Sequence, residues 1–353
     1  MLVRDFDFIL PPELIAQQPA ADRGGARLLT LDRATGRTAH ATVTDLPAAL
    51  DRGDLLVVNN TRVFPARLLG RRVPSGGAVE CLLVKRASES SASEEIWEAL
   101  MHPGQRLKPS MKVVFEGGEG TLHGEVLERR FFGRRMIRLW AGAGASVQDV
   151  VDRIGHVPLP PYVQRDDDPS DRERYQTMFA HERGSIAAPT AGLHFHPRLV
   201  SVLKQRGIEL AEITLHVGYG TFQPVRTDRV EDHRLDSETF AISDAAAAAL
   251  NGALDQGRRI VAIGTTTTRA LEAVAIAHSG RIVAGRGTTD VFIYPGFEFR
   301  IVRGLLTNFH LPKSSLLMLV CAFAGREAVL AAYRDAVVGK YRFYSYGDAM
   351  LIL

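Results

Sequence analysis

Residues 187–225, AAPTAGLHFHPRLVSVLKQRGIELAEITLHVGYGTFQPV, set the fold class. Residues 197–206 predict a short helix, because Pro197 suits a first helical turn and Gly207 suits the left-handed position after a last turn. Residues 208–215 then predict a strand. Two clusters rich in Gly, Thr and His therefore lie at joints between elements, where glycine lets the backbone approach a ligand and helix amides attract anions. This pattern indicates a small-molecule site.

Helices and strands alternate through the rest of the C-terminal half. The predicted helices are residues 244–256, 268–278, 316–323 and 327–338, and the predicted strands are residues 259–263 and, earlier in the chain, 54–59. Strands that alternate with helices favour a layered α/β domain.

Residues 66–138 have a different pattern, with short alternating strands between Gly, Pro and Ser turns. This pattern predicts a small all-β barrel. Its predicted strands include residues 79–85, 96–101, 112–115 and 136–139. Residues 87–95, ASESSASEE, are typical of a disordered loop.

A helix over residues 147–154, with Ser146 as its N-cap, and a stiff proline-rich linker over 155–162 follow the barrel. The simplest arrangement is an α/β domain formed by both ends of the chain, residues 1–65 and 155–353, with a barrel inserted over residues 66–154.

Composition is that of an ordinary globular protein, with 46% hydrophobic and 24% charged residues among 353. The N-terminus lacks the apolar core of a secretory signal, and the longest apolar run, 316–324, is too short to cross a membrane. Cys81 and Cys321 form no metal spacing or disulfide framework, which favours a reducing cytoplasm. We expect a monomer, because no helix shows a spare heptad seam.

The net charge of +3 is too small to identify a nucleic-acid binder. Arginines do gather in two groups: Arg67, Arg71 and Arg72, and Arg129, Arg130, Arg134, Arg135 and Arg138. Such groups are most often solvated faces or weak ion pairs. A footprint for an RNA backbone is the alternative, which charge alone does not establish.

The segment RRIVAIGTTTTRALEAVA, residues 258–275, predicts a strand followed by a turn that opens a helix. Hydroxyls and amides at the start of a helix suit a phosphate or a carboxylate. The segment contains neither a P-loop nor a dinucleotide-binding turn. The alternative is a threonine-rich helix cap without a ligand.

Histidines offer a second kind of chemistry. His194 and His196 have a spacing that can bind a metal, with His181 and His216 as partners, but no carboxylate or cysteine lies at a recognisable spacing, so no metal is expected. An imidazole that transfers a proton is favoured, because its pKa lies near neutrality. Residues 231–233 (EDH) offer an acid/base pair or a merely charged loop. Further polar joints are residues 307–312 and 341–348, whose tyrosines suit either the core or stacking on a base.

At these positions the sequence resembles the S-adenosylmethionine:tRNA ribosyltransferase-isomerase family of queuosine biosynthesis. The matching segments extend over essentially the whole chain: NNTRVFPARL (59–68), IGHVPLPPY (154–162), AAPTAGLHF (187–195), TLHVGYGTFQPV (214–225), VEDH (230–233), GTTTTRALE (264–272), FIYPGF (292–297), LTNFHLP (306–312) and KYRFYSYGDAM (340–350). One departure is Thr267-Thr268, where the family is expected to carry Ser-Val.

The resemblance implies a barrel inserted in an α/β domain, as the patterns predict. It also implies that the ribosyl part of S-adenosylmethionine is transferred to 7-aminomethyl-7-deazaguanine at the wobble position of tRNA, giving epoxyqueuosine, adenine and methionine. S-adenosylmethionine would be consumed as a ribosyl donor, with no permanently bound cofactor.

This reaction needs a base, because the sulfonium makes the adjacent carbon acidic, and it needs a proton for the departing adenine. His194 and His216 are our first candidates for proton transfer, with His233 and Asp348 next. Thr265, Thr266 and Arg269 would hold the methionine carboxylate or a tRNA phosphate, and Tyr344 or Tyr346 would face the base or the sulfonium. The other candidate substrate-binding residues are Asn60, Thr61, Arg62, Thr190, Gly192, Gly218, Gly220, Thr221, Gly264, Asn308 and His310.

Two alternatives belong to other classes. A methyltransferase-like or nucleotide-sugar enzyme would use the Gly264 turn for a phosphate, and a methyltransferase would release S-adenosylhomocysteine. A non-catalytic RNA-binding module would bind tRNA through the barrel without consuming S-adenosylmethionine.

Overall fold

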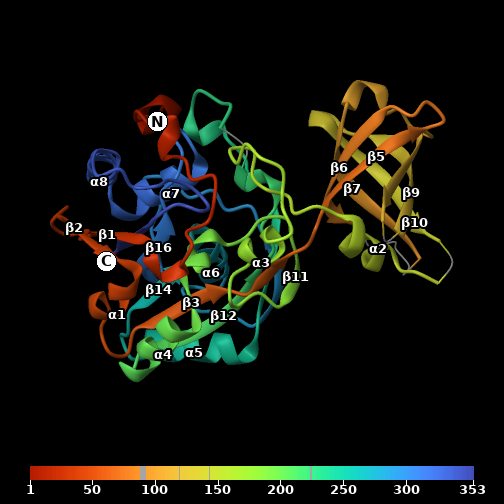
Figure 1. Ribbon diagram of the computed structural model, residues 1–353. Coiled ribbons are helices and arrows are strands. Elements are labelled where there is room, and N and C mark those ends of the chain that lie inside the picture. Colours follow the sequence, from red (N-terminus) through yellow and green to blue (C-terminus); the bar gives the residue numbers. More distant parts are fainter. Residues whose placement is uncertain (88–92, 119, 143, 223–224) are drawn as a thin grey trace. The chain divides into compact units, whose positions relative to one another are not determined.

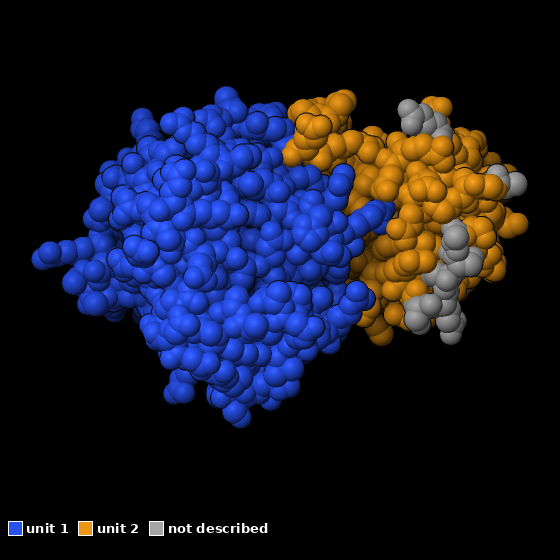
Figure 2. Space-filling model, turned by 90° about the horizontal axis from the view of Figure 1, so that it is seen from below, with its two compact units in different colours: residues 1–62, 160–165, 174–353 blue, residues 63–159, 166–173 orange. Residues whose placement is uncertain are grey.

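The computed structural model describes residues 1–87, 93–118, 120–142, 144–222 and 225–353 (Figure 1). The chain divides into two compact units (Figure 2). The α/β unit comprises residues 1–62, 160–165 and 174–353, and the barrel unit comprises residues 63–159 and 166–173. Both ends of the chain therefore build the α/β unit.

A nine-stranded sheet forms the centre of the α/β unit, in the order β15-β13-β12-β3-β14-β16-β17-β1-β2. Four neighbouring strands, β12, β3, β14 and β16, are parallel. The strands are β1 (Arg27–Leu31), β2 (Thr38–Thr42), β3 (Leu55–Asn59), β12 (Glu209–Leu215), β13 (Glu238–Ile242), β14 (Ile260–Ile263), β15 (Gly285–Thr289), β16 (Val302–Asn308) and β17 (Ala349–Ile352). Strands β4 (Thr61–Val63) and β11 (Glu182–Ser185) form a separate pair.

Helices cover both faces of this sheet. Because side chains alternate along a strand, Leu55 and Val57 of β3 enter one core while Leu56 and Val58 enter the other. The first core also contains residues of α5 (Asp244–Asp255), α6 (Thr265–Ala277), α7 (Ser315–Ala324) and α8 (Arg326–Val338). The second contains residues of α1 (Leu46–Ala49) and α4 (Pro197–Gln205). Strands β3 and β14 are buried along their whole length, as expected for parallel strands between two helical layers.

The barrel unit is a closed barrel in the order β10-β7-β6-β5-β8-β9. Its strands are β5 (Arg67–Val73), β6 (Ala78–Arg86), β7 (Glu94–His102), β8 (Lys112–Gly117), β9 (Gly120–Arg129) and β10 (Arg134–Ala141). Buried and outward residues alternate along β6, where Val79, Cys81 and Leu83 point inward. Helix α2 (Val147–Ile154) follows, with the Ser146 side chain accepting from the N–H of Asp149. The predicted α/β domain with an inserted barrel is confirmed.

Residues 155–159 belong to the barrel unit, whereas the sequence predicted them in the α/β domain. His156 pairs with Arg67 at the start of β5 through two backbone hydrogen bonds of 2.8 and 3.2 Å. The Asp167 carboxylate accepts from the N–H of Val157 and contacts the His156 ring, at 2.9 Å each. These bonds tie the proline-rich segment to the barrel. Residues 166–173, which include Asp167, belong to the barrel unit as well. Helix α3 (Asp171–Arg174) begins in this segment.

Two other predictions need correction. Glu94 and Glu95, assigned to a disordered loop, are the first residues of β7, and Glu95 is buried where it accepts from the indole N–H of Trp97. Residues 88–92 of that predicted loop lie outside the described residues. Helix α6 begins at Thr265 rather than at residue 268, since Gly264 at φ +95° makes the turn directly after β14.

No single helix within the described residues is long and apolar enough to span a membrane. Helices α7 and α8 pass that test only as a pair, with a bend of 116° between them.

Candidate functional site

A cleft of about 470 Å³ lies in the α/β unit. Gly264 follows β14 there, Asn308 ends β16, and Val217 follows β12, so the carboxyl ends of three parallel strands meet at the cleft. Ligands of open α/β sheets bind at this edge, and a cleft of this size holds a small molecule. Its lining also includes Tyr162, Ala188, Pro189, Thr190, Ala191, Val225, Thr265, Thr266, Thr307, His310, Leu311, Pro312, Lys313, Ser314, Leu316, Tyr344 and Ser345.

The first turn of α6 gives the cleft its best anion-binding group. Thr265 and Thr266 line the cleft, and the first N–H groups of a helix have no partners within it. The next two threonines point elsewhere, because Thr267 Oγ1 donates to the carbonyl of Ile263 at 2.8 Å and Thr268 Oγ1 to that of Gly264 at 3.2 Å. The hydroxyls of Thr267 and Thr268, the pair at which the sequence departs from the family, are therefore bonded to backbone carbonyls at the start of α6.

Residues at the end of β16 supply further polar groups to the cleft. Asn308 donates from Nδ2 to the carbonyl of Tyr344 at 3.0 Å, and its buried Oδ1 has no hydrogen-bond partner among the described residues. His310 Nε2 lies 2.8 Å from Thr307 Oγ1. Burial lowers the pKa of His310 to about 3, so this imidazole is neutral at pH 7.

Two tyrosines form an aromatic wall of the cleft. The ring centroids of Tyr162 and Tyr344 are 3.9 Å apart, and Tyr162 Oη contacts Ser345 Oγ. Tyr344 has a left-handed backbone, φ +75°, which is costly for a large residue and is often found at functional sites. Its hydroxyl is buried without a partner among the described residues. An aromatic face beside unpaired oxygen atoms suits a base or a cation.

His194 and Tyr346 line a smaller hollow of about 30 Å³ with Arg23 and Arg174. Burial lowers the pKa of His194 to about 4, although the Asp348 carboxylate opposes that shift. The buried Nε2 of His194 has no partner among the described residues. Ser345 lines both this hollow and the cleft, so the two adjoin.

His216 lies beside Thr61, with Nδ1 2.8 Å from the threonine hydroxyl. Burial lowers the pKa of His216, and Val217, the next residue, lines the cleft. Neighbouring Asn60 is held by other groups, since its Oδ1 accepts from Thr214 Oγ1 at 2.7 Å. Arg62 is exposed.

Asp348 is buried and anchored by two arginines. Its carboxylate accepts from the backbone N–H groups of Arg27 and Arg342 at 3.1 and 2.8 Å, and from both guanidinium groups. His233 lies in an edge-to-face contact with Phe292, at 5.1 Å between ring centroids, and burial lowers its pKa. The structure therefore does not bring His233 and Asp348 to the lining of the cleft that its described residues form.

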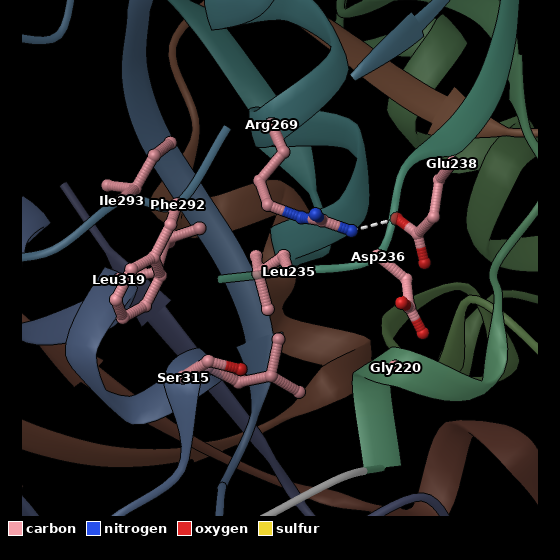
Figure 3. Close-up of a pocket in the computed structure, with 10 residues that line it drawn as sticks. Gly220, Leu235, Asp236, Glu238, Arg269, Phe292, Ile293, Ser315 and Leu319 are labelled. Atoms are coloured by element: carbon pink, nitrogen blue, oxygen red, sulfur yellow. Dashed lines mark hydrogen bonds and ion pairs between the residues drawn. The ribbon is translucent and has the colours of Figure 1, made fainter. Parts of the chain in front are cut away.

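Arg269 contacts the Glu238 carboxylate next to a cavity of about 10 Å³ (Figure 3). Both side chains are almost fully buried, at 6% and 4% exposure. Glu238 Oε1 also accepts from the N–H of Gly218 at 2.8 Å. Gly220 lines the same small cavity with Asp236, so Arg269 and the two glycines belong to one group outside the large cleft.

The remaining predicted residues have mixed positions. A Cβ on Gly192 would lie 2.8 Å from Thr177 Cγ2, so close packing requires this glycine. Of the histidines with metal-binding spacing, His196 Nδ1 accepts from the N–H of Leu199 at 3.4 Å as the cap of α4, and His181 Nε2 contacts Glu212 at 2.9 Å. The side chain of Thr221 lies outside the described residues.

Sequence reasoning missed Tyr162, Lys313 and Ser314 as lining residues. Tyr162 ends the proline-rich motif, which predicted only a linker, and the other two follow the 307–312 joint. The Lys313 ammonium lies 2.7 Å from the Asp7 carboxylate, which holds a positive charge at the rim of the cleft.

Several arginines of the barrel unit face acidic residues. Arg71 pairs with Glu116 at 2.9 Å, and Arg138 pairs with Glu125 at 2.6 Å. Arg135 is buried and donates from Nε to the carbonyl of Leu107 at 3.1 Å. These contacts favour ion pairing and packing as their role over a bare cationic surface.

Comparisons with known proteins agree along the whole chain. Residues 3–352 match the family model described as queuosine biosynthesis protein. The S-adenosylmethionine:tRNA ribosyltransferase-isomerase of Heliobacterium modesticaldum is 50% identical over 353 residues, and that of Desulfitobacterium hafniense is 48% identical, each alignment covering 100% of both chains. The crystal structure of S-adenosylmethionine tRNA ribosyltransferase from Thermotoga maritima matches with a TM-score of 0.55 and 37% identity, over 99% of this chain and 100% of that one.

Proposed function

The chain belongs to the queuosine biosynthesis family of S-adenosylmethionine:tRNA ribosyltransferase-isomerases, and we propose that its cleft is where the ribosyl group of S-adenosylmethionine is transferred. The acceptor is the aminomethyl group of 7-aminomethyl-7-deazaguanine at the wobble position of tRNA. The products are epoxyqueuosine-tRNA, adenine and methionine. S-adenosylmethionine is consumed in each turnover, and no resident cofactor is needed.

One observation carries this proposal: a single cleft joins a helix N-terminus, an aromatic wall and two buried oxygen atoms, Asn308 Oδ1 and Tyr344 Oη, that have no hydrogen-bond partner within the part of the chain that the structure describes. The first turn of α6, with Thr265 and Thr266, is suited to the methionine carboxylate. The Tyr344 ring and the Asn308 Oδ1 atom are suited to the sulfonium and to the purine. Such a division of the lining matches a ligand that has an anionic end, a cationic centre and an aromatic base.

Proton transfer falls to a neutral imidazole in this proposal. A base must remove a proton from the carbon beside the sulfonium, and an acid must protonate the departing adenine. His216 and His194 are both neutral at pH 7, because burial lowers each pKa, so each can accept a proton. His216 precedes Val217 of the cleft wall, and we place it first. Asp348 is committed to Arg27 and Arg342, so we assign it a structural role.

We further propose that the enzyme acts as a monomer in the cytoplasm. Both cysteines, Cys81 and Cys321, are buried free thiols, which suits a reducing compartment. Light scattering of the purified protein with and without tRNA tests the oligomeric state.

The deciding experiment incubates the protein with S-adenosylmethionine and tRNA that carries 7-aminomethyl-7-deazaguanine. Mass analysis of the nucleosides should show epoxyqueuosine, with adenine and methionine released in equal amounts. The matched control is the same tRNA with guanine at the wobble position, which should give no product. Release of S-adenosylhomocysteine would instead identify a methyltransferase, and binding of tRNA without consumption of S-adenosylmethionine would identify an RNA-binding module.

A further inference from the structure

The small hollow beside the cleft, called the arginine pocket here, has an unusual charge. Its lining consists of Pro19, Ala20, Arg23, Ala26, Arg174, Leu193, His194, Ser345, Tyr346 and Gly347. The described residues of this lining thus include two arginines and one histidine but no carboxylate.

The two guanidinium groups of the arginine pocket act on each other. Arg23 is partly buried, and both its burial and the neighbouring Arg174 lower its pKa. Arg174 is held in place by the backbone, because its guanidinium donates to the carbonyls of Ala20 and Ala21. Two cations held this close repel each other, and an anion between them would remove that repulsion.

His194 forms a polar wall of the pocket. It is 5% exposed, and its buried Nε2 makes no geometric hydrogen bond among the described residues, while the Asn308 side chain and the Asp348 carboxylate both act on the ring. A buried polar atom without a partner is costly unless a ligand or water satisfies it. The pocket therefore offers two guanidinium groups and a buried imidazole in the same place, at a site that shares Ser345 with the cleft.

We propose that the arginine pocket binds a backbone phosphate of the tRNA, next to the nucleotide whose base enters the cleft. This inference rests on the proposed function, because it assigns the pocket to the same substrate. A phosphodiester fits the chemistry, since arginine forks bind phosphate oxygens and a polymer phosphate stays partly in solvent beside two half-exposed arginines. The methionine carboxylate of S-adenosylmethionine is the other available oxyanion, but the first turn of α6 can hold it inside the cleft.

The test compares Arg23→Gln and Arg174→Gln with a matched control, Arg33→Gln. Arg33 is also partly buried, and both this burial and a second arginine, Arg303, lower its pKa. Its guanidinium lies over the Phe323 ring at 4.0 Å, in a different depression that Asp32 also lines. The control thus removes the same charge from a similar setting that adjoins neither hollow.

Binding of the precursor tRNA is measured by fluorescence anisotropy between 50 and 200 mM salt, together with KM for both substrates. Each pocket variant should bind tRNA about tenfold more weakly, and the slope of log K against log salt should become shallower by about 0.7–0.9, as for one lost phosphate contact. KM for S-adenosylmethionine and kcat at saturating tRNA should stay within about twofold of wild type. Arg33→Gln should match wild type throughout.

Three results would overturn the proposal: a raised KM for S-adenosylmethionine with unchanged tRNA binding, which would assign the pocket to the carboxylate; an equal loss in Arg33→Gln; or no change in either pocket variant. Arg23→Lys and Arg174→Lys keep the charge without the fork, so they replace any glutamine variant whose melting temperature falls. The proposed function is judged separately, by adenine release from the wild-type enzyme. Tight tRNA binding with an unchanged salt slope and normal adenine release would sink the phosphate site alone.

Discussion

The carboxylate of Glu238 accepts a 2.8 Å hydrogen bond from the backbone N–H of Gly218. Its second oxygen contacts Arg269, which lies one helical turn beyond the cleft-lining Thr265 and Thr266 of α6. Gly218 follows Val217, another residue of the cleft wall. This buried pair therefore ties the turn after β12 to the helix after β14, and it holds two walls of the cleft together.

Breaking this pair should destabilise the protein strongly. Removing one partner of a buried ion pair leaves the other charge uncompensated, and Arg269→Met should lower the free energy of unfolding by about 3–5 kcal/mol. The measurement is urea denaturation. The control is Arg281→Met, which breaks an exposed pair with Asp255 (49% and 60% exposed) and should cost at most about 1 kcal/mol. Equal losses in both variants would contradict the structural role of the Arg269 pair.

The threonines in the first turn of α6 should differ in role, with some binding the ligand and others only stabilising the helix. Thr266→Ala should raise KM for S-adenosylmethionine about tenfold, because a hydrogen bond to a charged group contributes about 1.5–3 kcal/mol. Thr267→Ala removes a hydroxyl that donates to the carbonyl of Ile263, and it should leave KM unchanged. Steady-state kinetics on both variants decides this. If Thr267→Ala raises KM as much as Thr266→Ala does, the carboxylate does not bind at this turn.

Gly184 should be required for the position of His216. A Cβ at residue 184 would lie 2.6–2.8 Å from three atoms of the His216 ring, so Gly184→Ala must displace that ring from Thr61. We expect kcat to fall about a hundredfold or more, because a general base contributes about 10²–10⁴-fold to the rate. Gly252→Ala in α5, where a Cβ has no neighbour within 4 Å among the described residues, is the matched control. Full activity of Gly184→Ala would remove His216 from the proton-transfer step.

Stability should fall as the pH drops below 6.5. The folded-state pKa values of His194 and His310 are about 4 and about 3, below the usual value of 6.5, so the unfolded chain binds protons first. Each ring should therefore cost about 1.4 kcal/mol of stability per pH unit between pH 6.5 and its folded pKa, with no effect above pH 6.5. Unfolding free energies measured at pH 7, 6 and 5 should show a shallower slope for His194→Gln. An unchanged slope would mean that His194 takes up its proton in the folded protein at the ordinary pKa.

Asp348 should behave as an anchor for Arg27 and Arg342. Asp348→Ala should cost about 1–3 kcal/mol of stability, because it leaves the backbone N–H groups of Arg27 and Arg342 without their acceptor, while both guanidinium groups stay partly in solvent. In Asp348→Asn, which keeps the shape, the pH profile of kcat should retain its wild-type form. A folded Asp348→Asn enzyme whose kcat falls a thousandfold would restore Asp348 as a catalytic group.

The sequence predicted best where a strand and a helix meet at a marked turn. Pro197 and Gly207 delimit α4 closely, because both residues restrict the backbone directly. The strands at 27–31 and 349–352 escaped prediction, since each is only four or five residues long and pairs with a partner from the other end of the chain. Local pattern contains no information on such pairing.

The predicted site residues also divide into those that the local sequence identifies correctly and those that it does not. Residues with an unusual local signature, such as Thr265, Asn308 and Tyr344, do line the cleft. Arg269 and Asp348 attracted attention for the same charge that their ion-pair partners neutralise. Spacing along the chain does not show which acid a given arginine faces, so only the fold could distinguish an anchor from a group that is open to a ligand.

The pairing of β1 with β17 also affects how the protein is made. Leu28 lies in register with Ala349, so the N-terminal strand finds this partner only after the 320 residues between them have been synthesised. The barrel, by contrast, is closed by residues 67–141 alone and can fold while the rest of the chain is still being translated. The nascent chain must therefore hold β1, with its buried Leu29 and Leu31, unpaired with β17 until β17 has emerged from the ribosome. Truncated products of translation would expose that strand, which makes them natural clients for chaperones and proteases.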